Sequence, residues 1–422
     1  MISRSYFIKR RRSFLLKLKA KGFSCYTTLE DCINIGRSLP LLSKKKTLTC
    51  NLKKKTTYFR HTGSFTIASN VNWIVILKKK ISKKFKYTVK KNLYFKYIFL
   101  KVSEVIPNIP SNFMYKNRPP SVVYLFFKKR YVSGVAVIYN TTTHFENTAL
   151  GSVITFRGMG KGFPVYKNNS YSFIRYLVDF FISESLKHGF TEVSLPVLVK
   201  AGQVFRTGQL PDKEGQMFMV GKDNLYLLPT AEVSVTNLLN NKKLHLSDLP
   251  ILYSSYSLCF RREIGGWGRL NKGLNRVHQF DKVELVKVVD YLNSNEGLIL
   301  LSNNVIALLD KLNITYRVIS IWGPDLSFSG SKQLDIEVWS YGQGKWLEVS
   351  SCSNMTTFQA RRLKLYFSNK KRKHYPHTLN GSGLAVQRVL VSLLENSLLG
   401  CYKEVKIPCI MKYKYVYKNI GL

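Results

Sequence analysis

The hydrophobic positions of residues 151–422 follow the periods of helices and strands and predict an α+β domain. Residues 171–189 have the spacing of an amphipathic helix that ends at Gly189, and residues 191–199 alternate like a strand. Further strand-like segments are 225–228, 251–260, 277–288, 315–322, 334–340 and 345–351, and further helical segments are 230–240, 296–312 and 383–397. Because the strands cluster without βαβ alternation, we predict an antiparallel sheet flanked by helices.

The first 110 residues have a different pattern. Two long, weakly amphipathic stretches, 27–60 and 70–104, flank the polar segment 61–64, which predicts two antiparallel helices joined by a turn. The aromatic and β-branched content of the second stretch suits strands equally well, and Pro40 interrupts the first. Prolines at 107, 110, 119 and 120 mark a boundary. We therefore divide the chain into an N-terminal helical hairpin (1–110), a connecting segment (111–150) and a larger domain (151–422).

The charge of the chain adds a class of partner to this outline. The 422 residues include 66 Lys and Arg but 24 Asp and Glu, a formal net charge of +42, and a hydrophobic content of 45% argues against wholesale disorder. Residues 1–110 carry 26 basic and 3 acidic side chains, so more than half of the excess charge lies on about a quarter of the chain. Such a surface predicts a nucleic acid as partner, with compositional drift toward lysine as the alternative.

The seven cysteines argue against a disulfide framework and against a zinc site. They are scattered, odd in number and form no C-x-x-C pair, so we expect a reducing compartment. No apolar run approaches the roughly 20 residues of a membrane span, and we expect no membrane as partner. The basic, acid-free residues 1–23 have the composition of an organellar transit peptide.

Two predicted strands and the loop between them form a candidate nucleotide site. The sequence has no G-x-x-x-x-G-K-[ST] motif and no G-x-G-x-x-G after a strand, so any ATP would be held by side chains on a sheet. Arg261 and Glu263 share one face of the first strand, and a glycine-rich basic loop follows. One face of the second strand carries His278, Phe280, Lys282 and Glu284. Arginine suits a phosphate and phenylalanine suits a base, whereas a cross-strand ladder of ion pairs is the alternative.

Two later segments add candidate ligands for a metal and for an anion. Glu348 and Ser351 offer the hard oxygens that Mg²⁺ prefers, but a spacing of three places them on opposite faces of a regular strand. Both can therefore reach one site only across a bulge or at a strand end. Arg388 lies in the first turns of an apolar helix after the glycine-containing segment 380–383. A buried arginine there is costly unless it meets an anion, although the same side chain can also extend to solvent.

These segments in series closely resemble the seryl-tRNA synthetase family of class II aminoacyl-tRNA synthetases. The matching segments, in the family's order and spacing, are TGQLPDKEGQMF (207–218), LYLLPTAEVSVTN (225–237), CFRRE (259–263), GLNRVHQFDKVELV (273–286), LEVSSCSN (347–354), FQARRLKL (358–365) and HTLNGSGLAVQRVL (377–390). The resemblance covers residues 151–410 and implies the class II fold, with residues 151–422 as the catalytic domain.

The resemblance also implies a serine pocket and an ATP site. The serine-binding positions of the family match Thr230, Ala231, Glu232, Arg261, Glu284 and Ser382. The ATP-binding positions match Arg261, Arg262, Glu263, Arg276, Phe280, Glu348, Val349, Ser350, Ser351 and Arg388. Arg261 matches the arginine on the α-phosphate and Arg388 the arginine on the γ-phosphate, and these two are the expected catalytic residues. Phe280 matches the residue that stacks on the base, and Glu232 suits the ammonium group of serine.

The reaction that the family implies uses ATP and Mg²⁺ and no zinc. L-Serine is activated with ATP to seryl-adenylate and is then transferred to the 3′ end of tRNA(Ser). Glu348 and Ser351 match the Mg²⁺ ligands, which supports a bulge between them. We expect a cytoplasmic homodimer with residues 166–181 at its interface. Two rivals are a catalytically weakened RNA-binding paralogue and a class II enzyme that charges another amino acid or a carrier protein.

The front of the chain and a few site positions depart from the family's pattern. IPNIP (106–110) matches the point where the family's chain leaves its tRNA-binding coiled-coil arm, and residues 7–23 look like the usual first helix, so we expect no appended leader. The family usually has Ala, Asp and Arg where this chain has Ile264, Leu270 and Lys272, and a small residue or proline at Gln387. We expect these changes to affect loop shape and contacts with the tRNA end.

Overall fold

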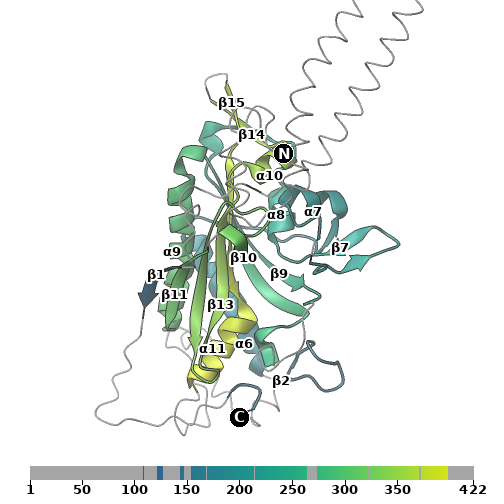
Figure 1. The fold of residues 1–422 in the computed structure, drawn as a ribbon, viewed down its shortest axis with the longest axis vertical. Coiled ribbons are helices and arrows are strands. Elements are labelled where there is room, and N and C mark those ends of the chain that lie inside the picture. Colours follow the sequence, from purple (N-terminus) through teal and green to yellow (C-terminus); the bar gives the residue numbers. More distant parts are fainter. Residues whose placement is uncertain are drawn as a thin grey trace, which may run out of the picture. The chain divides into compact units, whose positions relative to one another are not determined.

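The structure is a computed structural model that describes one compact unit of the chain (Figure 1). The described residues are 108, 121–126, 143–146, 154–167, 169–212, 214–263, 273–321, 323–369 and 372–397, all within the unit Asn108–Leu422. The predicted hairpin (27–60 and 70–104) lies outside the described residues, as do the departures at Ile264, Leu270 and Lys272. Within the predicted connecting segment, residues Ser121–Phe126 and 143–146 are described.

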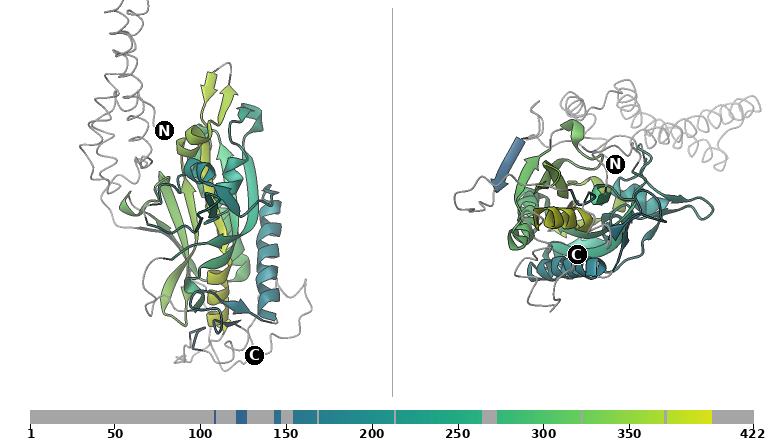
Figure 2. Two further views of the ribbon diagram at one scale, coloured as in Figure 1. Left: turned by 90° about the vertical axis from the view of Figure 1, so that its right-hand side faces the viewer. Right: turned by 90° about the horizontal axis from the view of Figure 1, so that it is seen from below.

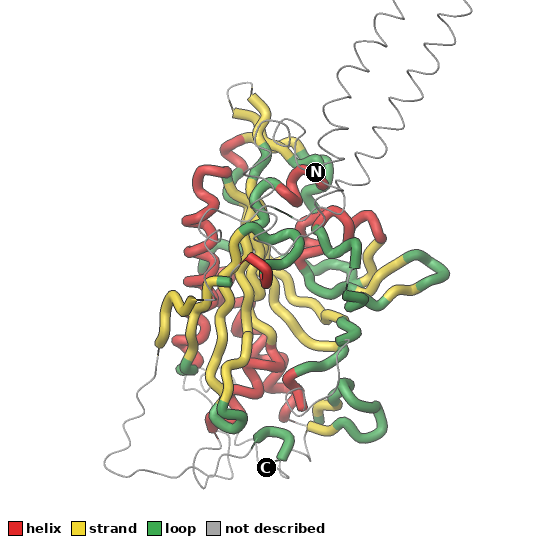
Figure 3. The backbone as a smooth tube through the Cα atoms, in the orientation of Figure 1, coloured by secondary structure: helices red, strands yellow, loops and turns green. Residues whose placement is uncertain are grey.

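An eight-stranded sheet forms the centre of the described unit, and Figure 3 shows its strands side by side. In spatial order the strands are β1 (Ser121–Phe126), β11 (Tyr316–Ser320), β12 (Lys332–Ser340), β13 (Lys345–Asn354), β16 (His377–Ala385), β10 (Gln279–Val289), β9 (Ile251–Phe260) and β4 (Thr191–Glu192). Neighbouring strands are antiparallel except for β4, which pairs parallel with β9. The prediction of an α+β fold with an antiparallel sheet is confirmed.

Three smaller sheets lie around the main one. They are β15–β14–β8 (Arg372–His374, Tyr366–Asn369, Lys243–His245), β2–β3 (Ile154–Thr155, Val165–Tyr166) and β5–β7–β6 (Leu198–Lys200, Leu225–Leu227, Met219–Val220). The predicted strand 191–199 is wrong as one element, because its two ends join different sheets as β4 and β5. Pro196 lies between them, and a proline cannot donate the hydrogen bond that a continuous central strand requires.

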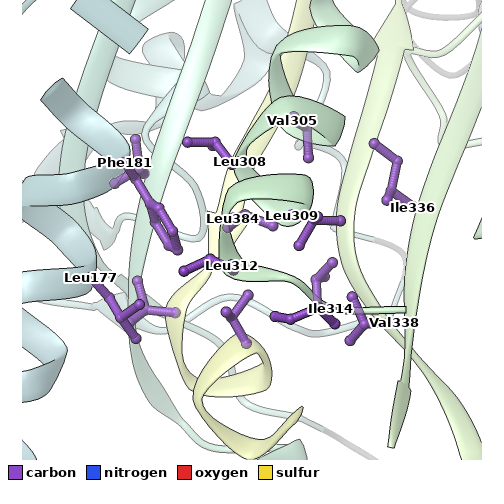
Figure 4. Close-up of a cluster of buried hydrophobic side chains, with 14 of the residues drawn as sticks. Leu177, Phe181, Val305, Leu308, Leu309, Leu312, Ile314, Ile336, Val338 and Leu384 are labelled. Atoms are coloured by element: carbon purple, nitrogen blue, oxygen red, sulfur yellow. The ribbon is translucent and has the colours of Figure 1, made fainter. Parts of the chain in front are cut away.

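Three long helices pack against the main sheet in one hydrophobic core. They are α6 (Asn169–Lys187), α9 (Ser294–Leu312) and α11 (Val386–Ser397), and α6 runs alongside the strands in Figure 2. Figure 4 shows Leu177 and Phe181 of α6 and Leu308 of α9 directed into the same cluster. Full burial of each such side chain contributes about 1.5–3 kcal/mol, so this core anchors the sheet on which any site must be built.

The second face of β10 belongs to a different environment. Val283 and Leu285 lie in the core with the three long helices, whereas Val286 and Val288 lie in two smaller clusters. Those clusters include residues of α7 (Ala201–Thr207), α8 (Glu232–Asn237) and α10 (Phe358–Leu363). Since side chains alternate along a strand, Glu284 lies on the face away from the long helices. We call this second face of the sheet the cleft face.

The segment 377–385 is a central strand, although the sequence pattern predicts a helix over 383–397. The strand β16 continues to Ala385, and α11 begins at Val386. Its glycines allow close packing on both sides. A Cβ atom at Gly381 would lie 2.9 Å from Cys352 Sγ, and one at Gly383 would lie 3.1 Å from the carbonyl oxygen of Val283. Glycine in a strand interior is often a sign of such close approach.

A β-bulge in β13 places Glu348 and Ser351 on the same side of the sheet. Ile336 pairs with Ser350 and Glu337 pairs with Glu348, so one residue of β12 spans two steps of β13 and Val349 is the extra residue. A bulge of this kind shifts the alternation of side chains by one. The bulge that the sequence analysis required for Glu348 and Ser351 to reach one metal ion is therefore present. Among the described residues, no helix has both the length and the apolar content that a membrane crossing requires.

Candidate active site

Two adjoining cavities open on the cleft face. The larger has a volume of about 490 Å³ and the smaller about 60 Å³. Six residues line both cavities: Arg261, Glu263, Arg276, Lys282, Glu348 and Ser382. They come from the ends of β9 and β10 and from β13 and β16, so the sheet joins segments that are far apart in the sequence. Most of the residues expected in a site thus line one continuous space.

The inner wall of the larger cavity is a network of charged and hydroxyl groups. Lys282 Nζ lies 2.7 Å from Glu284 Oε2 and donates to Thr230 Oγ1 at 2.9 Å. The hydroxyl of Thr230 donates to the same carboxylate oxygen at 2.9 Å, and Asn380 Nδ2 donates to Glu284 Oε1 at 3.4 Å. Glu284 is fully buried, and a buried charge is tolerated when it is paired and hydrogen-bonded in this way. The predicted alternative of an exposed ion-pair ladder does not describe these residues.

Glu232 is a second buried carboxylate in the larger cavity. It begins α8 with 2% of its surface exposed, and Gln359 Nε2 donates to its Oε1 at 2.5 Å. Burial raises the pKa of Glu232 to about 7, and the neighbouring Glu284 raises it too, while the hydrogen bond from Gln359 and the charge of Lys282 act in the opposite direction. A cation that enters the cavity stabilises the ionised form of such a buried carboxyl group.

Arginine side chains and one aromatic ring line the smaller cavity. The guanidinium of Arg261 lies 5.4 Å from the centre of the Phe280 ring, and its Nε donates to the carbonyl oxygen of Pro229 at 3.4 Å. Glu263 has a left-handed backbone (φ +46°), and its carboxylate accepts Arg276 Nε at 2.9 Å. Such a conformation costs about 1–2 kcal/mol, so the ion pair helps to fix a strained position beside the cavity.

Arg388 lies in the first turn of α11 at the other end of the smaller cavity. Its Nη1 donates to the carbonyl oxygen of Glu348 at 2.7 Å, and its Nε donates to the carbonyl oxygen of Asn275 at 3.3 Å. The Glu348 carboxylate is 3.8 Å from the same guanidinium. These contacts hold Arg388 with its side chain only 29% exposed. An arginine fixed at each end of a narrow cavity can bind an extended anion.

The bulge in β13 lies beside two neighbouring acidic side chains, Glu348 and Asp335. Ser351 donates a hydrogen bond to Asp335, and burial together with the charge of Glu348 raises the pKa of Asp335 to about 7. Glu348 and Ser351 line the larger cavity. Within the ranges that the structure describes, no three His, Cys, Asp or Glu side chains are grouped so as to hold a metal ion by themselves. Two oxygen ligands from protein suit Mg²⁺, which usually keeps water and substrate phosphates as its other ligands.

Four residues of the predicted site line neither cavity. Ala231 and Ser350 are buried, and Glu284 is connected to the larger cavity through Thr230, Lys282 and Asn380. Arg262 is exposed and donates through Nη1 to the carbonyl oxygen of Gly215 at 3.3 Å. The roles assigned to these residues stay predictions.

Gln387, one of the departures from the family's pattern, lines the smaller cavity. It is 2% exposed in the first turn of α11, accepts a hydrogen bond from the Asp281 backbone at 2.9 Å and donates to Asp281 Oδ2 at 2.7 Å. It therefore joins α11 to β10 beside Phe280. Gln359, Asn380 and Asp335 were not predicted as site residues from the sequence, since polar residues in an apolar pattern are only a weak indication of a site.

Comparison with known proteins identifies the family of the cleft-bearing region. Residues 218–397 match the model of the tRNA synthetase class II core domain (G, H, P, S and T). The chain is 44% identical over 264 residues to a serine--tRNA ligase of Akkermansia muciniphila, which covers 61% of this chain and 62% of that protein. It is 45% identical over 240 residues to a serine--tRNA ligase of Chlorobium phaeobacteroides, with 56% of each chain covered. The chain thus spans about three fifths of the length of the curated relatives it matches.

Two solved structures share the fold. A seryl-tRNA synthetase from Pyrococcus horikoshii complexed with ATP has a TM-score of 0.90 at 24% identity, covering 100% of this chain and 99% of that one. A cytoplasmic serine-tRNA ligase from Naegleria fowleri in complex with AMP has a TM-score of 0.86 at 21% identity, with the same coverage. Residues 218–397 thus match a class II tRNA synthetase core domain, and over the aligned part of its length the chain is similar to serine--tRNA ligases.

Proposed function

We propose that this protein is a serine--tRNA ligase that activates L-serine with ATP and transfers it to the 3′ end of tRNA(Ser). The observation that carries the proposal is the pairing of the two cavities: a cation- and hydroxyl-binding pocket directly beside a narrow slot with an aromatic ring and three arginines. Its relatives are serine--tRNA ligases, and two proteins of the same fold are described as complexes with ATP or AMP.

In this proposal the larger cavity binds serine. The Glu232 carboxylate receives the substrate ammonium group, and Thr230 and Ser382 lie beside the side-chain hydroxyl, with Glu284 bonded behind Thr230. Lys282 neutralises the charge of Glu284. The carboxylate of Glu232 is then the negative charge that meets the ammonium group of serine. A buried site that hydrogen-bonds a hydroxyl group strongly rejects alanine, because its polar groups would be left unpaired.

The smaller cavity binds ATP in the same proposal. Phe280 stacks on the base, Glu263 lies near the adenine, and Arg261 contacts the α-phosphate where the two cavities meet. Arg388, with its guanidinium held by two carbonyl oxygens, contacts the γ-phosphate. Glu348 and Ser351 are the proposed protein ligands of Mg²⁺, which supplies charge neutralisation of the phosphates when bound.

The chemistry requires no nucleophile from the protein. A carboxylate oxygen of serine attacks the α-phosphorus, the bond to the bridging oxygen breaks, and pyrophosphate leaves with seryl-adenylate retained. A ribose hydroxyl at the tRNA 3′ end then attacks the serine carbonyl carbon and releases AMP. The chain contributes by holding the reactants in line and by placing Arg261 next to the charge that develops on the α-phosphate.

We further propose a cytoplasmic homodimer that grips tRNA through residues 1–110. The buried free thiols of Cys259 and Cys352 support a reducing compartment. A groove of about 610 Å³ along α6, lined among others by Tyr171 and Tyr256, supports an interface that includes residues 166–181. Glu348, Ser351, Arg261 and Arg388 all line the cavities, which argues against the alternative of a weakened RNA-binding paralogue.

The function is tested by ATP–pyrophosphate exchange with serine, alanine and threonine, followed by charging of tRNA(Ser). We expect exchange with serine alone and transfer of the label to tRNA(Ser). Equal exchange with threonine or alanine would reassign the amino acid. Serine activation without charging would contradict the proposed role of residues 1–110.

The KM for serine is expected to depend on pH through Glu232. Its pKa of about 7 in the free protein means that a proton competes with the substrate ammonium below neutrality. Since only the ionised carboxylate binds the ammonium, the KM for serine at pH 6 should exceed that at pH 8 by about tenfold, while the KM for ATP changes little. Glu232→Gln should raise the KM at pH 8 and flatten the profile. A KM for serine that is constant between pH 6 and 8 in the unmodified protein would contradict the assignment.

A further inference from the structure

A buried histidine outside the cavities is connected to them by hydrogen bonds. His144 lies in the turn 143–146, which is closed by a hydrogen bond from the Glu146 backbone to the Thr143 carbonyl oxygen at 3.1 Å. The side chain is 5% exposed and lies between the 3-10 turn Gly273–Asn275 and helix α11. Nothing in the mechanism above uses it.

Both ring nitrogens of His144 have partners that fix the tautomer. Nε2 lies 3.0 Å from the backbone nitrogen of Leu274, and a backbone N–H can only donate, so Nε2 is the acceptor. The proton of the neutral ring is then on Nδ1, which donates to Glu395 Oε1 at 2.7 Å. Burial raises the pKa of Glu395, but hydrogen bonds from His144 and Ser340 lower it by more. The net pKa lies below the usual value for glutamate, so the carboxylate is ionised. A charged acceptor makes the bond from Nδ1 a strong one.

The imidazole of His144 lies so close to the backbone of Gly273 that a side chain at this position would clash with it. Gly273 has φ +68°, and a Cβ atom there would lie 2.1 Å from His144 Nε2. The imidazole therefore packs directly against the backbone of the turn Gly273–Asn275.

The same network reaches Arg388. Glu395 Oε1 also accepts Gln343 Nε2 at 3.0 Å, and the amides of Gln343 and Asn275 exchange hydrogen bonds at 2.7 and 3.3 Å. The carbonyl oxygen of Asn275 is the acceptor for Arg388 Nε. Hydrogen bonds thus connect both Leu274 and Asn275 to the carboxylate of Glu395. The path from Leu274 runs through His144, and the path from Asn275 runs through Gln343.

We propose that His144 is a positioning residue for ATP binding: paired with Glu395, it fixes the backbone of Leu274 and Asn275 and through it the guanidinium of Arg388. Its effect is expected on the phosphate-binding arginine and not on the serine pocket, because the hydrogen bonds of His144 run to Leu274 and Glu395, whereas those that join Thr230, Lys282 and Glu284 run to one another. The proposal rests on the proposed function for the identity of the anion.

The matched variants His144→Asn and His144→Gln test the two halves of this contact. The amide of Asn occupies the position of Nδ1 and keeps a donor for Glu395, but leaves the Leu274 N–H without an acceptor. The amide of Gln reaches the position of Nε2 and supplies that acceptor. In pyrophosphate exchange, His144→Asn should raise the KM for ATP about tenfold with the KM for serine unchanged, and His144→Gln should recover most of the loss. His188→Asn, an exposed histidine, serves as the control.

A purely structural role gives a different result. Loss of folded protein lowers kcat and leaves both KM values unchanged, and that outcome, in a variant whose thermal unfolding is measured in parallel, would overturn the proposal. In an Arg388→Lys background His144→Asn should change the KM for ATP by less than about twofold, whereas additive effects would also overturn it.

Failure of the proposed function is distinguishable from failure of this inference. If the unmodified protein shows no serine-dependent exchange, the proposed function fails. Equilibrium binding of ATP to the same variants then still tests His144, with a weaker Kd for His144→Asn expected and an unchanged Kd overturning the role.

Discussion

Replacing Arg261 with alanine is expected to lower serine-dependent ATP–pyrophosphate exchange by about a thousandfold or more while the protein stays folded. Arg261 lines both cavities, at the place where the carboxylate of serine would meet the α-phosphate of ATP. In the proposed reaction, removing the guanidinium removes a positive charge beside the negative charge that develops on the α-phosphate. A thousandfold loss corresponds to about 4 kcal/mol of transition-state stabilisation. Steady-state exchange kinetics measure it directly.

Folding of this variant is expected to be nearly unaffected. Arg261 is only partly buried, and its one hydrogen bond through Nε, to Pro229, is long at 3.4 Å. Arg157→Ala removes an exposed arginine away from the cavities and is the matched control. Exchange at the unmodified rate in Arg261→Ala would refute the proposed adenylation site, whatever the effect on tRNA charging.

Glu348→Gln is expected to lower the exchange rate about a hundredfold at a limiting Mg²⁺ concentration, and excess Mg²⁺ should restore part of the loss. The variant keeps the shape of the side chain but loses one of the two proposed protein ligands. The carbonyl oxygen of Glu348 still accepts Arg388 Nη1, so the position of that arginine is preserved. The measurement is the exchange rate as a function of Mg²⁺ concentration.

Glu337→Gln is the control for Glu348→Gln. Glu337 pairs with Glu348 across the sheet, but its carboxylate binds Arg317 at 2.6 Å and lines neither cavity. It should leave the Mg²⁺ dependence unchanged. An unchanged Mg²⁺ dependence in Glu348→Gln as well would show that the residue is not a metal ligand.

Sequence periodicity predicted the parts of the site that lie on one strand. The two-residue repeat of β10 was sufficient to place Phe280, Lys282 and Glu284 on a common face, and the structure has Phe280 and Lys282 in the wall of a cavity with Glu284 bonded behind them. Local patterning also predicted the helices that became α6 and α9 to within a few residues. These features depend on neighbours in the chain, which a single sequence contains.

The remaining features depend on contacts between distant segments. The bulge at Val349 is defined by the pairing of β13 with β12, and β16 is a strand because Gly381 and Gly383 fit closely packed neighbours. His144 lies 251 positions from Glu395, and Gln359 lies 127 positions from Glu232. No periodicity in the sequence reports such pairs, so the second layer of the site could be found only from the fold.

The carboxylates gathered in and beside the cleft have a consequence for the way in which substrates arrive. Glu232, Glu263, Glu284, Asp335 and Glu348 gather in or beside one cleft of a chain that has only 24 acidic residues and a net charge of +42. The long-range field of the protein therefore attracts ATP and RNA and repels the ammonium group of an amino acid, while the field inside the cleft favours that ammonium group. Association with the polyanions is accelerated by this arrangement and slows with ionic strength, whereas a zwitterionic amino acid, with no net charge, enters at a rate that salt hardly changes.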